Sequence, residues 1–261
     1  MPADNAKLLP GEAEPAPTAI PNQLEMHLLS HVFLWASITL FAGFALLHYP
    51  AFPHADGTPS GVSVDYWNVA FHWSCLLWLL GFVMLTHWIL TLPGPLDKAG
   101  LAGCLLKVVA AIFFNVNPLS ALLGYAGNYG VNWSNLTGII FFHVGNCVSV
   151  YSMRGQLEWN RVFAPSTLHV VGMWIYLLAT TFLVPADALA YQSLVLQKTV
   201  NQDFVKFGQL FGSAMLILGS LVYTHWSAYR GSYCACFTSA ARCTFRETVG
   251  VPGRLVVVSE A

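Results

Sequence analysis

Charged residues are scarce in this sequence of 261 residues, which is 9% charged and 56% hydrophobic. A water-facing domain carries about 25% charged residues, so the composition excludes a soluble globular protein. It also excludes a disordered chain, because such chains are poor in hydrophobic residues. The formal net charge is -1 and there is no run of Lys or Arg, which excludes a basic nucleic-acid binder. The composition therefore predicts a polytopic membrane protein.

Motifs of known enzyme chemistry are also missing. The sequence has no zinc-protease, Walker, GxSxG or dinucleotide-binding motif. It has neither paired carboxylates nor the series of histidine boxes found in di-iron desaturases. The carboxylates near the apolar segments all fall in predicted loops: Asp65, Asp97, Glu158, Asp187 and Asp203. No metal site is predicted.

Six apolar segments are long enough to cross a bilayer, which needs about 20 residues per helix. They are residues 27–49, 66–92, 100–126, 135–153, 164–184 and 204–229. Pro- and Gly-rich breakers separate them. The predicted fold class is all-α, a polytopic transmembrane bundle of six helices. The transmembrane domain spans residues 27–229, between a disordered acidic tail at 1–26 and a C-terminal tail at 230–261.

The distribution of Lys and Arg predicts the orientation of the bundle. Both tails and the second and fourth loops share one side, which holds Lys7, Lys98, Arg154, Arg161, Arg230, Arg242, Arg246 and Arg254. The first and third loops hold no Lys or Arg. The fifth loop holds Lys198, and Lys206 follows just inside the last helix. Both termini are therefore predicted to be cytoplasmic.

Two polar features interrupt the third predicted helix. Lys107 lies about two turns from the cytoplasmic end, where a long side chain can reach the headgroups. The alternative is a buried functional lysine. Asn115, Asn117 and Pro118 lie near the midpoint and predict a kink, because proline removes a backbone donor. The two amides either satisfy the broken turn or line a polar cavity.

Nine histidines make this residue the most informative polar type in the chain. Three interpretations are open. The histidines either lie at the membrane interface or form hydrogen bonds between helices. Alternatively, opposed histidines ligate a b-type haem, for which His72 and His143 are the cofactor-binding candidates. In the third interpretation an intramembrane site holds a catalytic or metal-binding histidine, with His143 as the candidate base.

A polar cluster is predicted in the outer half of the bundle, between the second, third and fourth helices. Its members are Asn68, His72, Asn115, Asn117, His143 and Asn146. Residues three or four apart on one helix face the same neighbour, and polar groups are costly against lipid, so these side chains are expected to bury one another. The cluster is either a functional site or a clamp that fixes helix packing.

Two segments resemble helices of the rolling-stone proteins. Residues 65–78, DYWNVAFHWSCLLW, resemble the aromatic and leucine-rich second helix of that family. Residues 143–154, HVGNCVSVYSMR, are similar to its later His-Gly-x-Asn-Ser helix, which ends in an arginine. The related androgen-induced proteins are six-helix hydrolases that cleave fatty-acid esters of hydroxy fatty acids with an intramembrane threonine and histidine. Those positions correspond to Phe71 and Asn146 here, so the resemblance implies a non-hydrolytic member. Ser74 with His143 is the alternative catalytic pair.

The cysteines fall into two groups. Cys234, Cys236 and Cys243 follow the last helix closely and are predicted sites of S-acylation, with unmodified thiols as the alternative. Zinc is disfavoured because a fourth ligand is missing. Cys75, Cys104 and Cys147 lie in predicted helices and are expected to be apolar packing residues.

The sequence thus predicts an integral membrane protein of rolling-stone-like type that acts without catalysis, through contacts with the lipid bilayer or with membrane-protein partners. The first alternative is an intramembrane lipid-ester hydrolase or other lipid-modifying enzyme. The second is an electron-transfer protein with haem b, whereas the main prediction has no cofactor. The expected location is the endoplasmic reticulum or the plasma membrane.

Overall fold

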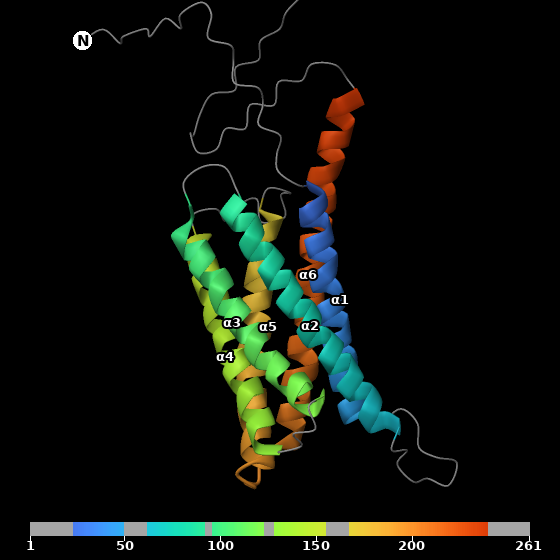
Figure 1. The fold of residues 1–261 in the computed structure, drawn as a ribbon, viewed down its shortest axis with the longest axis vertical. Helices are drawn as coiled ribbons and strands as arrows, with labels where there is room; N and C mark the ends of the chain where they lie inside the picture. The colour runs from blue at the N-terminus through green and yellow to red at the C-terminus, as the bar shows by residue number, and fades with distance from the viewer. Residues whose placement is uncertain (1–22, 50–61, 92–95, 123–127, 155–166, 240–261) are drawn as a thin grey trace, which may run out of the picture.

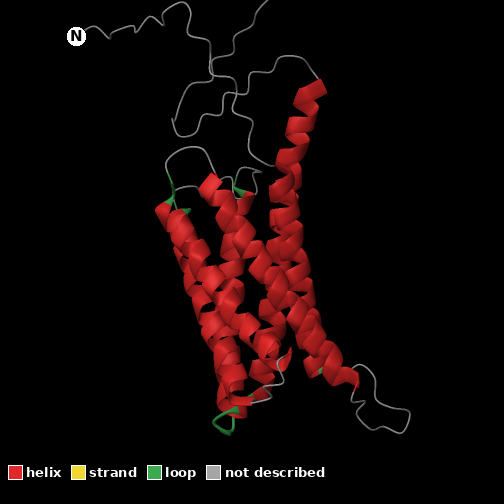
Figure 2. Ribbon diagram, in the orientation of Figure 1, coloured by secondary structure: helices red, strands yellow, loops and turns green. Residues whose placement is uncertain are grey.

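The computed structural model describes residues 23–49, 62–91, 96–122, 128–154 and 167–239. These residues form six helices and no strand (Figures 1 and 2). The helices are α1 (Gln23–His48), α2 (Val62–Thr91), α3 (Lys98–Leu122), α4 (Asn128–Ser152), α5 (Leu168–Leu194) and α6 (Gln202–Ser239). The prediction of an all-α bundle is confirmed for this part of the chain.

Three helix boundaries differ from the sequence prediction by seven residues or more. Helix α4 begins at Asn128, seven residues before the predicted start. Helix α5 continues through Pro185 to Leu194, so Asp187 is helical and its assignment to a loop is wrong. The loop assignment is also wrong for Asp65, which lies in α2, and for Asp203, which lies in the first turn of α6. Helix α6 continues to Ser239, into the predicted tail. Hydropathy reports only the stretch of a helix that suits hydrocarbon, and a helix can extend past it where its backbone remains hydrogen-bonded.

The six helices form a closed ring. Each helix packs against its neighbours along the chain, and α6 packs against α1. Adjacent helices are antiparallel, so the start of α1 and the end of α6 lie at the same end of the bundle (Figure 1). We call this the N/C end and the opposite one the far end. Residues of helices that are distant in sequence, such as α1 and α6, therefore share one interface.

The outer surface of the ring is apolar. Large hydrophobic side chains are exposed along the helices, among them Trp35, Trp73, Ile112, Trp133, Leu178 and Leu221. An apolar surface of this extent marks contact with a membrane. Five helices, α1, α2, α3, α5 and α6, contain described segments long and apolar enough to cross a bilayer. The protein is therefore an integral membrane protein.

Small residues bring the helices into close contact. A Cβ added to Gly208 of α6 would lie 2.6 Å from Ala186 Cβ, and one added to Gly145 of α4 would lie 2.9 Å from Gly103 O. Buried serines form hydrogen bonds between helices, such as the one of 2.9 Å between Ser37 Oγ of α1 and Ser220 Oγ of α6. Small and hydroxyl side chains are typical of interfaces between transmembrane helices.

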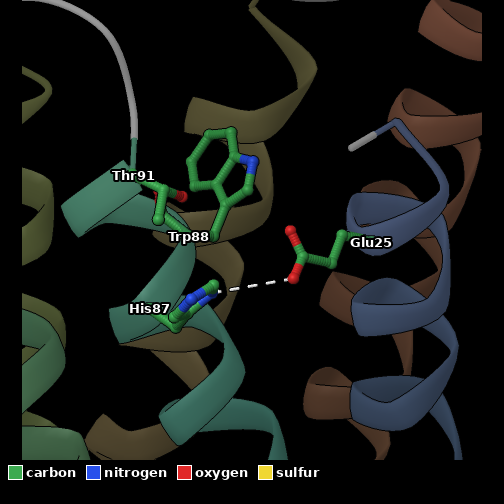
Figure 3. Close-up of polar contacts among 4 residues, drawn as sticks. All are labelled: Glu25, His87, Trp88 and Thr91. Atoms are coloured by element: carbon green, nitrogen blue, oxygen red, sulfur yellow. Dashed lines mark hydrogen bonds and ion pairs between the residues drawn. The ribbon is translucent and has the colours of Figure 1, made fainter. Parts of the chain in front are cut away.

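A polar contact links α1 and α2 at the N/C end. His87 Nδ1 lies 3.6 Å from Glu25 Oε1 (Figure 3). On α1 itself, the Nε2 atoms of His27 and His31 are 3.2 Å apart. His27 also contacts Ser227 of α6 at 3.3 Å. These histidines take part in contacts at the end of the bundle.

Candidate functional site

A cavity of about 40 Å³ lies inside the ring, and all six helices contribute to its wall. Its lining residues are Leu40, Phe44, Phe71, Ser74, Cys75, Trp78, Phe114, Asn135, Ile139, Phe142, Leu183, Asp187 and Leu216. A volume of this size holds about three water-sized groups. The wall is apolar and aromatic apart from Ser74, Asn135, Asp187 and the thiol of Cys75.

Trp78 of α2 anchors an aromatic cluster beside this cavity. It is 3% exposed, and its ring centroid lies 5.4 Å from that of Phe33, 5.3 Å from that of Phe142 and 6.0 Å from that of Tyr176. Rings from α1, α2, α4 and α5 therefore meet in the middle of the ring. Aromatic pairs at these separations are stabilising beyond the area that they bury, so this side of the cavity is firmly packed.

A chain of hydrogen bonds links the far end of the bundle to the cavity. His48, at the last residue of α1, donates from Nε2 to Gln209 Oε1 at 2.8 Å. Gln209 of α6 is 6% exposed, and its Nε2 donates to Asp187 Oδ1 at 2.8 Å. Asp187 lies seven residues before the end of α5, about 10 Å along the helix. Three helices thus fix one carboxyl group at the cavity wall.

Ser74 and Asn135 supply the other polar oxygens of the wall. Ser74 is fully buried and donates its hydroxyl hydrogen to Ala36 O at 2.8 Å, so only lone pairs remain. Asn135 Oδ1 is buried and has no hydrogen-bond partner among the described residues. A buried acceptor without a partner costs free energy, which a bound donor would recover.

The predicted site residues of α4 face α5. His143 Nδ1 lies 2.9 Å from Thr180 Oγ1, and the fully buried Thr180 also donates to Leu177 O at 3.0 Å. Asn146 is 1% exposed, and its Nδ2 donates to Tyr176 O at 3.5 Å. His143 and Asn146 thus each connect α4 to α5.

The remaining members of the predicted cluster lie on α2 and α3. Asn115 Nδ2 donates to Cys75 O at 2.9 Å and to Ala111 O at 2.8 Å, which links α3 to α2. His72 is partly buried on α2. Asn68 and Asn117 belong to α2 and α3, but their side chains lie outside the described residues, as does that of Pro118.

Within the described residues, no hydrogen bond joins His72, Ser74 or Asn115 to His143. The cavity is lined by neither His72 nor His143. Of the described members, Asn115 links α3 to α2, whereas His143 and Asn146 link α4 to α5. No group of three or more His, Cys, Asp or Glu side chains in the described ranges is arranged to hold a metal ion.

Lys107 of α3 is buried, with 3% of its surface exposed. Its Nζ donates to Ser149 Oγ of α4 at 2.9 Å and lies 3.9 Å from Met173 Sδ of α5. The prediction that this side chain reaches the headgroups is wrong. Close approach of α3 and α4 at Gly103 and Gly145 encloses the lysine before it reaches the surface.

The cysteines differ in their surroundings. Cys75 and Cys104 are buried, as expected of packing residues. Cys147 is exposed, and its Sγ lies 3.8 Å from His143 Nε2, so the packing prediction is wrong for this residue. Cys234 and Cys236 belong to the end of α6, but their side chains lie outside the described residues, and Cys243 lies wholly outside them.

His48, Asp187 and Gln209 are not marked by any motif in the sequence, and Asn135 begins only a glycosylation acceptor sequence, Asn135-Leu136-Thr137, which does not indicate a ligand site. The signal that was available is the polarity of Gln209 within an apolar segment, since such residues in a membrane helix are costly and often functional. Asp187 gives a misleading signal, because the preceding Val184-Pro185 pair is typical of a helix end.

Comparison of the chain with known protein families, curated proteins and solved structures finds no match. The class of protein follows from the fold and the surface instead. The described residues form an integral membrane bundle of helices with a cavity at its centre.

Proposed function

We propose that this protein is a six-span integral membrane protein that acts by binding a small molecule in its central cavity, without catalysis. In this proposal α4 crosses the membrane in addition to the other five helices. Both termini are cytoplasmic, so the far end of the bundle lies at the outer face of the membrane. The observation that carries the proposal is the cavity, which all six helices line and which has an apolar wall around one carboxyl group. Apolar pockets with a few converging polar groups are typical ligand sites.

The position of Asp187 supports binding. A carboxyl group in a membrane helix is costly, and residues of this kind are by default functional candidates. Gln209 and His48 hold the group in one orientation. A fixed orientation lowers the entropy that is lost when a ligand binds.

The contacts of the candidate nucleophiles favour binding over hydrolysis. The hydroxyl of Ser74 donates to Ala36 O rather than to His143. The hydroxyl of Thr180, which does contact His143, is fully buried and donates within its own helix. A nucleophile needs both a base and access to a substrate. Kinship with the rolling-stone proteins is a further proposal, and it rests on the two sequence segments alone.

The proposal is tested by filling the cavity. Ile139 lines it and is 4% exposed, whereas the adjacent Ile140 is 45% exposed on the outer surface. Full-length protein in nanodiscs is screened by thermal unfolding against amphiphilic amines, alcohols and acids, and native mass spectrometry records retained molecules. We expect ligand-dependent stabilisation in the wild type and in Ile140→Phe, and its loss in Ile139→Phe.

Two results would contradict this function. One is equal behaviour of the two isoleucine variants with every compound and in the retained molecules. The other is hydrolysis of a lipid ester that disappears in Ser74→Ala or Thr180→Val, since turnover through either hydroxyl would make the protein an enzyme.

A further inference from the structure

We propose that the cavity binds a primary ammonium group, either as a free small alkylammonium ion or as the head of a lipid amine. The inference rests on the proposed binding function and adds the chemical class of the ligand. Three acceptors in the cavity wall carry it, on Asp187, Asn135 and Ser74.

Gln209 fixes Asp187 as an acceptor. Because Gln209 Oε1 is taken by His48, the amide presents its NH2 group to Asp187 Oδ1. The other lone pairs of the Asp187 carboxylate can still accept hydrogen bonds. No Lys, Arg or His within the described residues lies at ion-pair distance from this carboxylate. Lys206 lies one turn before Gln209, but its Nζ is placed over the ring of Tyr49, 3.7 Å from the centroid.

The other two polar residues add acceptors. Ser74 has already donated its hydrogen to Ala36 O, so its oxygen can only accept. Asn135 Oδ1 is buried without a partner in the described part of the chain. A ligand that satisfies this wall must therefore bring several hydrogens to donate. A primary ammonium group carries three donors and no acceptor.

The apolar part of the wall also suits a cation. Five aromatic residues line the cavity: Phe44, Phe71, Trp78, Phe114 and Phe142. The face of an aromatic ring attracts an ammonium group, and the attraction grows when water is excluded. The carboxyl group and the aromatic rings thus both favour a positively charged ligand.

Other classes of ligand fit less well. A carboxylate or phosphate would be repelled by Asp187, and an alcohol would leave its charge uncompensated. A quaternary ammonium ion has no N–H donor, and its five or more heavy atoms exceed the roughly three water-sized groups that the cavity holds. Magnesium and calcium ions require six or more oxygen ligands, which this wall does not offer.

The test uses full-length protein in phosphatidylcholine nanodiscs and equilibrium binding of radiolabelled methylammonium. We expect saturable binding that ammonium displaces and that tetramethylammonium, methanol and acetate do not displace at the same concentration. Nanodiscs doped with octadecylamine distinguish a free alkylammonium ion from the head of a lipid amine as the ligand. Strong displacement by this lipid amine assigns the ligand to the bilayer, and its absence assigns it to the aqueous phase.

Asp187→Asn keeps the shape of the side chain and removes its charge, and we expect affinity for methylammonium to fall about 30-fold or more. The matched control is Asp203→Asn, an exposed carboxylate in the first turn of α6, which should bind as the wild type does. If Asp187→Asn does not fold, Phe142→Leu removes one ring from the wall and should weaken binding about twofold to fivefold.

The proposal is overturned if methylammonium fails to bind, if acetate or tetramethylammonium displaces it equally well, or if Asp187→Asn folds and binds as the wild type does. If one of these results is found but alcohols or acids still stabilise the wild type and not Ile139→Phe, the cavity binds a ligand of another class and the proposed binding function holds. When Ile139→Phe and Ile140→Phe behave alike with every compound, the binding function itself fails.

Discussion

Gln209 Nε2 donates a hydrogen bond of 2.8 Å to Asp187 Oδ1, while the oxygen of the same amide accepts one from His48. One buried glutamine therefore connects α1, α5 and α6 and sets the orientation of the carboxyl group in the cavity wall. Its two contacts depend on each other, because rotation of the amide would break both.

Gln209→Leu should lower the free energy of unfolding by about 1–3 kcal/mol, since it leaves buried polar groups without partners. Equilibrium unfolding of the purified protein measures the change. Gln202→Leu is the control, because Gln202 is exposed and makes one surface contact with Ser193. The control should change stability by no more than about 0.5 kcal/mol. Equal losses in the two variants would show that Gln209 has no structural role at this site.

Lys107 and Ser149 give a second prediction. Ser149→Ala removes the oxygen that accepts from Lys107 Nζ and should destabilise the protein by about 1–3 kcal/mol. Lys107→Met removes the buried amine altogether and should be neutral or stabilising. The control is Lys198→Met in the exposed α5–α6 connection. Unfolding titrations compare the three variants, and a large loss in Lys107→Met would contradict the prediction.

The close approach of α5 and α6 at Gly208 gives a third prediction. Gly208→Ala brings a methyl group to 2.6 Å from Ala186 Cβ and 3.0 Å from Phe182 O, so the helices must separate. Overpacking of this kind costs about 1–3 kcal/mol. Ala214→Val on the exposed face of α6 adds volume without a neighbour and serves as the control. Thermal unfolding that ranks Ala214→Val as the more damaging change would refute this account of the interface.

The orientation is tested with two leucines that are matched in exposure. Leu96, before α3, is 46% exposed, and Leu196, after α5, is 50% exposed. In intact cells a membrane-impermeant maleimide should label Leu196→Cys and leave Leu96→Cys unlabelled, because the Lys and Arg count places the N/C end in the cytoplasm. In permeabilised cells both Leu196→Cys and Leu96→Cys should be labelled. The reverse pattern would invert the assignment.

S-acylation of the C-terminal cysteines remains a prediction. An acyl-exchange assay should give a hydroxylamine-dependent mass shift on the wild type, which disappears when Cys234, Cys236 and Cys243 are all changed to Ser. The buried Cys75 provides the control, because Cys75→Ser should leave the shift unchanged. A wild-type protein without any shift would exclude the modification.

Hydropathy predicted the membrane class and six helices, and five of these are long and apolar enough in their described residues to cross a bilayer. The boundaries were less certain where a helix leaves hydrocarbon. Pro185 is the clearest case, since α5 continues past it to Leu194 and carries Asp187 into the cavity wall. A proline stops a helix only where no other group satisfies the backbone that it frees.

The sequence by itself determined that costly polar groups such as Lys107, His143 and Asn146 lie among apolar residues, so that each required a partner. Only the tertiary structure decided which partners they have. Closure of the ring brings α6 beside α1, and Gln209 thereby meets His48 across 161 positions of the chain. Helical periodicity shows which residues share a face but not which helix that face meets, because many apolar surfaces pack equally well in pairs.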